Sequence, residues 1–116
     1  MIVGIQGTSS FSDYNVFLRS MGVAMSMLSK DDKEFVIYSA GPGNVNKMVM
    51  EFTNLSERGM KSRGKKIKMF RVAPSWINEN IESFNYFIYL ATPKEQNSTL
   101  VAQAQLNNIE VGIFKY

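Results

Sequence analysis

The sequence predicts an α/β domain with a five-stranded, mainly parallel sheet and helices on both faces. Short apolar runs alternate along the chain with segments whose apolar residues recur at helical spacing. Such alternation is typical of parallel strands joined by right-handed helical crossovers. The length of 116 residues suits one domain, and no repeat or long linker interrupts it. Small polar turns follow three of the apolar runs, at the strand ends where sheets of this class bind ligands.

Five strands and four helices are expected in a single domain over residues 1–116. The predicted strands are residues 1–5, 34–39, 65–72, 86–91 and 109–114. The predicted helices are residues 14–28, 44–58, 77–84 and 98–106. Among the strands, 1–5 and 86–91 are mainly apolar, as in buried strands. Residues 65–72 alternate between apolar and charged side chains, which predicts a strand nearer the sheet edge.

The first two helices have clear sequence signals. Ser12 or Asp13 is a suitable N-cap for the first helix. Its apolar residues form one stripe at Phe17, Met21, Ala24 and Leu28. The second helix directly follows a glycine-containing turn, and Gly59 and Gly64 mark its expected frayed end.

The second half of the chain is marked by turn residues. Residues 73–76, Ala-Pro-Ser-Trp, predict a turn before the short helix over 77–84. Ser98 or Asn97 is a suitable N-cap for the last helix, and the pair Asn107-Asn108 breaks that helix before the last strand.

The three small polar turns are residues 7–10, 40–44 and 96–99. The middle turn is the most informative, because Gly41 and Gly43 lie between a strand and a helix N-terminus. Unpaired backbone N–H groups and the helix dipole make such a turn suitable for phosphate or another anion. We expect the three turns to line one cleft, with the amides of the glycine turn pointing inward. The candidate ligand-binding residues are Gly7, Thr8, Ser9, Ser10, Ala40, Gly41, Gly43, Asn44, Asn97, Ser98 and Thr99.

Each turn also has a structural explanation. Gly41 and Gly43 suit a positive φ and close packing of helix against strand. The hydroxyl groups at residues 9, 10, 98 and 99 suit the capping of helices as well as the binding of phosphate. Both explanations stay open at this point.

The composition excludes several kinds of chemistry. The chain contains no cysteine and no histidine. Disulfides, thiolate metal sites, a cysteine nucleophile and a Ser-His-Asp triad are therefore ruled out. The chain also lacks the dinucleotide-binding fingerprint and the phosphate-loop signature. We therefore predict no cofactor and no metal site.

The hydropathy pattern predicts a cytoplasmic protein without membrane partners. No apolar run approaches the roughly 18 residues of a membrane-spanning helix. The start of the chain lacks a basic region followed by a long apolar core.

The net charge is only +3, but basic residues are concentrated over 58–71. They are Arg58, Lys61, Arg63, Lys65, Lys66, Lys68 and Arg71. One explanation is a surface that contacts the phosphate backbone of nucleic acid. The other is a helix C-terminus followed by an edge strand that lysines protect from pairing. We favour the second, because aromatic side chains do not alternate with these charges as single-strand binding requires.

Several segments, taken in order, resemble the SLOG superfamily of Rossmann-like proteins, which includes the DNA-processing protein DprA and the LOG phosphoribohydrolases. Residues 7–14 resemble the Gly-x-Arg-x-Phe-x-Asp-Tyr start of the small YspA/YpsA-like subgroup. Residues 38–45 resemble its glycine turn, and 73–76 resemble its Pro-Ala-x-Trp segment. Residues 96–99 stand where the family has Ser-x-Gly-Thr. The resemblance implies a three-layer, Rossmann-like fold and ligands of the nucleotide class.

The chain departs from the family mainly at charged positions. Thr8 or Ser9 stands where the family has arginine. Val45 occupies the aspartate position unless Asn46 serves with a shift. The glutamate of the phosphoribohydrolase motif has no counterpart after Thr99. The resemblance therefore implies a ligand-binding member rather than a competent hydrolase.

These observations together predict a protein that binds a nucleotide or nucleotide-derived ligand without turnover. The alternative is a hydrolase of N-glycosidic or phosphoribosyl bonds. It needs a carboxylate, and only Asp13 and Glu95 lie near the predicted cleft. Nucleic-acid binding through residues 58–71 is a weaker alternative.

We also expect a homo-oligomer, either a dimer or a tetramer. The resemblance implies it, because small relatives of this kind assemble. Methionine side chains adapt readily to irregular packing, which suits both a core and a subunit interface. The methionines assigned to one or the other are Met21, Met25, Met48 and Met69.

Overall fold

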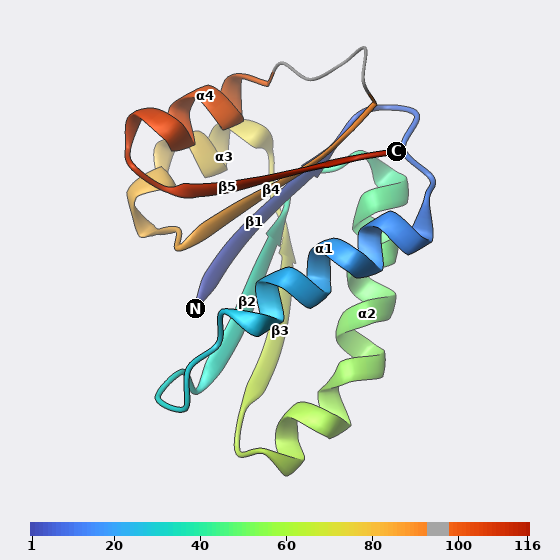
Figure 1. Ribbon diagram of the computed structural model, residues 1–116, viewed down its shortest axis with the longest axis vertical. Coiled ribbons are helices and arrows are strands. Elements are labelled where there is room, and N and C mark those ends of the chain that lie inside the picture. Colours follow the sequence, from blue (N-terminus) through green and yellow to red (C-terminus); the bar gives the residue numbers. More distant parts are fainter. Residues whose placement is uncertain (93–97) are drawn as a thin grey trace.

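The computed structural model describes residues 1–92 and 98–116. Its strands are β1 (Ile2–Gly7), β2 (Glu34–Ser39), β3 (Lys66–Arg71), β4 (Tyr86–Ala91) and β5 (Glu110–Lys115). Its helices are α1 (Tyr14–Ser26), α2 (Gly43–Ser62), α3 (Pro74–Glu79) and α4 (Thr99–Leu106), and a 3-10 turn, η1 (Ile81–Ser83), follows α3. Strands and helices alternate along the described residues (Figure 1). None of the described helices combines the length and the apolar character needed to cross a membrane.

The five strands form one sheet in the order β3-β2-β1-β4-β5. Every neighbouring pair is parallel, so the sheet is parallel throughout rather than mainly parallel. The predicted three-layer, Rossmann-like α/β fold is confirmed. The chain builds outward from β1 to β3, returns to the other side of β1, and builds outward again through β4 and β5. The order of the strands therefore reverses between β1 and β4.

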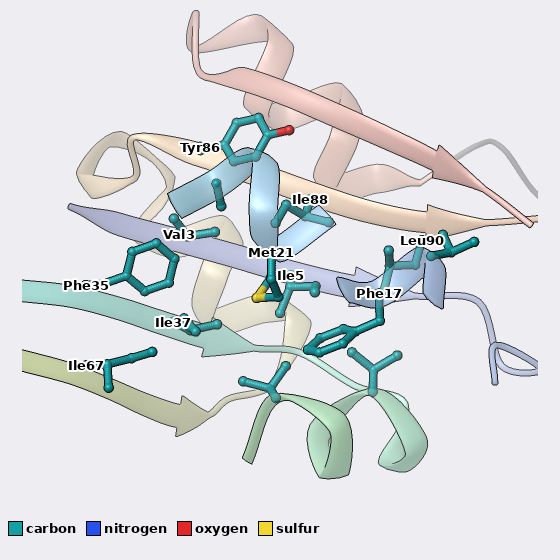
Figure 2. Close-up of a cluster of buried hydrophobic side chains, with 14 of the residues drawn as sticks. Val3, Ile5, Phe17, Met21, Phe35, Ile37, Ile67, Tyr86, Ile88 and Leu90 are labelled. Carbon is teal, nitrogen blue, oxygen red and sulfur yellow. The ribbon is translucent and has the colours of Figure 1, made fainter. Parts of the chain in front are cut away.

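Helices α1 and α2 cover one face of the sheet (Figure 1). The predicted apolar stripe of α1 packs here, and Phe17, Met21 and Ala24 have no exposed surface. Figure 2 shows Phe17 and Met21 among apolar side chains of the strands. The methionines at 21, 25, 48 and 69 all lie in this core or pack against it. Met21 is therefore a core residue, whereas Met25, Met48 and Met69 are only partly buried against that core. Self-association stays a prediction.

Helices α3 and α4 lie together on the opposite face (Figure 1). Beneath them, Ile77, Phe87 and Leu100 belong to a second core in which β4 is the central strand. This second core is smaller, and it does not extend over the whole face. At the β3 end of the face, Phe70 remains 46% exposed.

Helix α1 ends at Ser26 rather than at residue 28, and the helix expected over 77–84 is instead α3, which ends at Glu79 and is followed by the 3-10 turn η1. Two further differences have a clear physical reason. Helix α2 continues to Ser62, past the expected end near residue 58. Gly59 lies on its exposed side, while the next residue, Met60, is only 2% exposed and holds this turn in the core. Helix α3 begins at Pro74, inside the segment that was expected to be a turn, because proline suits the first turn of a helix.

Gly4 on β1 lies where the central strand meets the second core. A Cβ atom at this position would lie 2.8 Å from Cδ1 of Phe87 and 3.0 Å from Cε2 of Phe84. Both rings are buried, so neither has free space into which it can move. The absence of a side chain therefore lets two aromatic rings reach β1.

We predict that Gly4→Ala lowers the free energy of unfolding by about 1–3 kcal/mol, because the methyl group must displace two buried rings. The matched control is Gly22→Ala on the exposed side of α1, where nothing lies within 4 Å of an added Cβ atom. It should raise stability by about 0.5–1 kcal/mol, because alanine favours the helix. Urea denaturation measures both variants. Parental stability in Gly4→Ala would contradict the packing argument.

Candidate functional site

A cavity of about 520 Å³ opens where the strand order reverses. This volume lies within the usual range for small-molecule sites. The cavity lies beyond the carboxyl ends of β1 and β4, between the N-terminal ends of α3 and α4. The described residues that line it are Gln6, Gly7, Thr8, Ser9, Pro74, Ser75, Asn78, Tyr89, Ser98, Thr99 and Leu100.

The turn after β1 forms one wall of the cavity and is held by contacts on three sides. The Thr8 amide donates a hydrogen bond of 2.9 Å to the carbonyl oxygen of Leu90 on β4. The Thr8 hydroxyl is hydrogen-bonded to the hydroxyl of Tyr116, which also lies 3.3 Å from the Ser10 hydroxyl. Gly7 lies so close to α2 that a Cβ atom would be 2.7 Å from Cγ2 of Val45. The wall is therefore positioned by β4, α2 and the residue that follows β5.

The N-terminus of α4 forms the opposite wall. Ser98 is its N-cap residue, but the Ser98 side chain makes no capping hydrogen bond. Instead, the Ser98 hydroxyl donates a hydrogen bond of 3.0 Å to Oε1 of Gln6 on β1. The side chain that would normally satisfy an N–H group of the first turn is thus turned toward β1. This leaves the first-turn amides of α4 without that cap.

Helix α3 begins at the same cavity, with Pro74 and Ser75 in its first turn. Its N-cap residue is Ala73, which has no side chain capable of capping. Two helix N-termini therefore meet the cavity without side-chain caps. Each carries the partial positive charge of a helix dipole, which favours an anionic group nearby.

The described lining residues carry no acidic or basic side chain. Their polar groups are hydroxyls and side-chain amides, and the single ring is that of Tyr89, which is only 6% exposed. Hydroxyls and amides donate and accept hydrogen bonds but do not exchange protons readily near pH 7. This part of the cavity is therefore suited to holding a ligand by hydrogen bonds and helix dipoles.

The predicted site residues fall into three groups. Gly7, Thr8, Ser9, Ser98 and Thr99 line the cavity together. Ser10, Ala40, Gly41, Gly43 and Asn44 do not belong to its described lining. Asn97 and Glu95 lie outside the described residues. The cleft that was expected from three turns is formed instead by the first turn, the start of α4 and the start of α3.

The turn over residues 40–44 is hydrogen-bonded to the turn after β1, which forms one wall of the cavity. Gly41 has a φ of +89°, which favours glycine, whereas Gly43 is already the first residue of α2. The carbonyl oxygen of Gly41 accepts a hydrogen bond of 2.9 Å from the Gly7 amide. The buried Ser39 hydroxyl, just before this turn, donates to the side chain of Asn46. Asn46 is thus engaged within the turn, and Val45 is fully buried.

Asp13 also has a defined structural role. Its Oδ1 accepts a hydrogen bond of 3.1 Å from the Val16 amide, so it caps α1. It is not a lining residue of the cavity. No group of acidic side chains that could hold a metal ion occurs among the residues that the structure describes.

Sequence reasoning missed several lining residues. Gln6 and Tyr89 lie on strands whose apolar runs gave no sign of a site. Ser75 and Asn78 lie in a segment that we treated as a turn and a structural helix. A usable signal was Pro74, because proline is typical of the first helical position. It would have placed another helix N-terminus at the end of a strand.

Comparisons with family models, with curated proteins and with solved structures returned no match.

We predict that the Thr8–Tyr116 hydrogen bond stabilises the fold. Tyr116→Phe leaves the hydroxyl of Thr8, a residue only 4% exposed, without this partner. The free energy of unfolding should fall by about 1–2 kcal/mol. Thr8→Val should have a similar effect, and the double variant should lose less than the sum, because both polar partners are then gone. Denaturant titration of all four proteins measures this coupling, and strictly additive losses would contradict it.

Proposed function

We propose that this protein binds a nucleotide or nucleotide-derived ligand without turning it over. The observation that carries the proposal is the cavity at the β1–β4 junction, where two uncapped helix N-termini meet a neutral, hydroxyl-rich lining. In open parallel sheets, ligands bind outside the carboxyl ends of the strands where the order reverses. The cavity has that position.

The phosphate of such a ligand fits between the starts of α3 and α4. Backbone amides and the hydroxyls of Ser75 and Thr99 are suitable donors to its oxygens. No described lining side chain carries a negative charge that would repel it. Helix dipoles, rather than lysine or arginine, supply the favourable electrostatics.

The remainder of the ligand meets a mixed surface. Tyr89 and Leu100 contribute apolar area, while Gln6 and Asn78 offer amide donors and acceptors. This combination of apolar lining with a few polar groups is typical of small-molecule sites. The nucleotide class itself comes from the resemblance to SLOG proteins, which therefore remains part of the proposal.

Hydrolysis of a glycosidic bond is less well supported by the described residues. That reaction needs a carboxylate beside the bond that breaks. The Asp13 carboxylate caps α1 and is not part of the cavity lining. Glu95 is the other candidate, and it lies outside the described residues. Binding is thus the function that the described geometry supports best.

Ser75→Asp is predicted to weaken binding of a nucleoside monophosphate by at least tenfold, roughly the effect of placing a charge near a helix N-terminus. Ser75 is exposed in the first turn of α3, where aspartate is compatible with the helix. The matched control is Gly43→Asp, which puts the same charge at the start of α2, outside the described lining. Isothermal titration calorimetry should show a loss only in Ser75→Asp. A loss in Gly43→Asp alone would move the site to residues 40–44, and equal losses in both variants would contradict a local charge effect at the cavity.

Turnover is tested by incubation with nucleoside monophosphates, cyclic nucleotides and ADP-ribose-type nucleotides, followed by chromatography. We expect no free base to appear. Release of base that disappears in Asp13→Asn or Glu95→Gln would establish a hydrolase instead. Mass spectrometry of small molecules released on denaturation would identify a ligand that is retained during purification.

A further inference from the structure

Three aromatic rings form a continuous column on the sheet face that carries α3. Tyr38 on β2 is stacked between Phe70 on β3 and Trp76 on α3. The ring centroids of Tyr38 and Phe70 are 5.3 Å apart with an interplanar angle of 22°. Those of Tyr38 and Trp76 are 4.5 Å apart at 27°. The rings come from three separate elements, so only the fold brings them together.

The column has an open end at the edge of the sheet. Phe70 is its outer member, because β3 is an edge strand and Tyr38 is its register partner on β2. Phe70 is 46% exposed, unlike the core aromatics, and no strand pairs with β3 on the side away from Tyr38. A further flat ring placed against Phe70 would extend the column by one member.

Positive charge flanks this open end. Lys66 and Lys68 precede Phe70 on β3 at alternate positions, so they project from the same side of the strand. With Lys61, Lys65 and Ile67 they also line a hollow of about 360 Å³ beside the last turns of α2. That hollow lies on the α2 side of the edge, so Lys66 and Lys68 are the lysines that share the face of Phe70. Glu57 is the one acidic residue among the described lining.

Not all of these cations are equally available. The Lys65 Nζ donates to backbone carbonyls of Ser29 and Asp32, so its charge is already engaged within the chain. Lys68 forms an exposed ion pair with Glu34 at 3.4 Å, and such pairs are weak in water. Lys61 and Lys66 are exposed. The edge therefore keeps a positive balance beside the free ring.

We propose that the β3 edge binds single-stranded nucleic acid, with a base stacked on Phe70 and backbone phosphates along the lysines. A free ring face beside a row of cations is the combination that single strands use, because stacking tolerates any base and cations follow the backbone. A duplex cannot offer a base in this way, since its bases are already stacked and paired. A second copy of the chain would bring like charges together at this edge. The surface shares no described lining residue with the cavity.

The test is fluorescence anisotropy with a labelled 15-nucleotide oligothymidylate, with a 15-base-pair duplex as competitor. We expect saturable binding of the single strand that weakens with salt, and weaker binding of the duplex. Phe70→Ala should raise the Kd by about five- to one-hundredfold, the usual range for loss of one stacked base. Phe70→Tyr should retain binding, because it keeps the ring.

Charge variants separate backbone contacts from stacking. The double variant Lys66→Gln/Lys68→Gln should weaken binding and reduce its salt dependence. The matched control, Lys30→Gln/Lys47→Gln, removes two exposed lysines outside this surface and should bind more tightly than the first pair. Ile113→Ala, a 40% exposed residue on the other edge strand, controls for the loss of apolar surface.

Several outcomes would overturn the proposal: no saturable binding, preference for the duplex, or equal losses in the test and control variants. A change of oligomeric state in Phe70→Ala, measured by light scattering, would show that a second copy occupies the edge. Circular dichroism and the fluorescence of Trp76, the single tryptophan, confirm that each variant is folded.

Discussion

The reversal of strand order at β1 is the constraint on which the rest of the structure depends. Because β1 is paired on both sides, with Tyr38 on β2 and Phe87 on β4 opposite the same residue, Gly4, the chain builds outward in two directions. Crossovers between parallel strands are right-handed, so opposite directions put the helices on opposite faces. Helices α1 and α2 thus lie on one face, with α3 and α4 on the other. The cavity is the space that this divergence leaves beyond β1 and β4.

The cavity and the β3 edge differ in the source of their electrostatic potential. Around the cavity, polarity comes from hydroxyls, amides and helix N-termini, with no charged side chain among the described lining. Along the β3 edge, polarity comes from the charged ammonium groups of lysine side chains, of which Lys61 and Lys66 are exposed. The first source consists of partial charges fixed by backbone geometry, whereas the second is a row of full charges, and a polymer bound along such a row releases many counterions. A ligand at one surface and a polymer at the other would therefore respond differently to ionic strength.

The order and type of the elements could be predicted from the sequence, because the apolar periodicity of each segment matches its secondary structure. The end of α2 could not, because burial of Met60 overrides the weak helix propensity of Gly59. The site was predictable only in part. Thr8 and Ser98 follow strands and carry hydroxyls, so local sequence identifies them. Gln6, Ser75 and Tyr89 enter the cavity through contacts between elements, which no local pattern encodes.

The aromatic column is a second feature that local sequence patterns do not predict. Phe70 is the single aromatic residue of the basic stretch, so the sequence alone counted against single-strand binding. Its neighbours in the column, Tyr38 and Trp76, come from another strand and from α3, and only the fold brings them to this edge. The apolar and charged alternation in β3 correctly predicted an edge strand, with Ile67 turned to the core and Lys68 to solvent. That alternation contains no information about which rings the strand meets.

The contacts that surround the cavity also have a bearing on how the chain folds. Thr8 meets Tyr116 across 108 residues, and Gln6 meets Ser98 across 92. Contacts so distant along the chain require closure of very long loops, and they form only after most of the chain has become compact. We therefore expect the cavity walls to assemble late in folding. A bound ligand would contact segments from both ends of the chain and raise the free energy of unfolding as its concentration rises above its Kd.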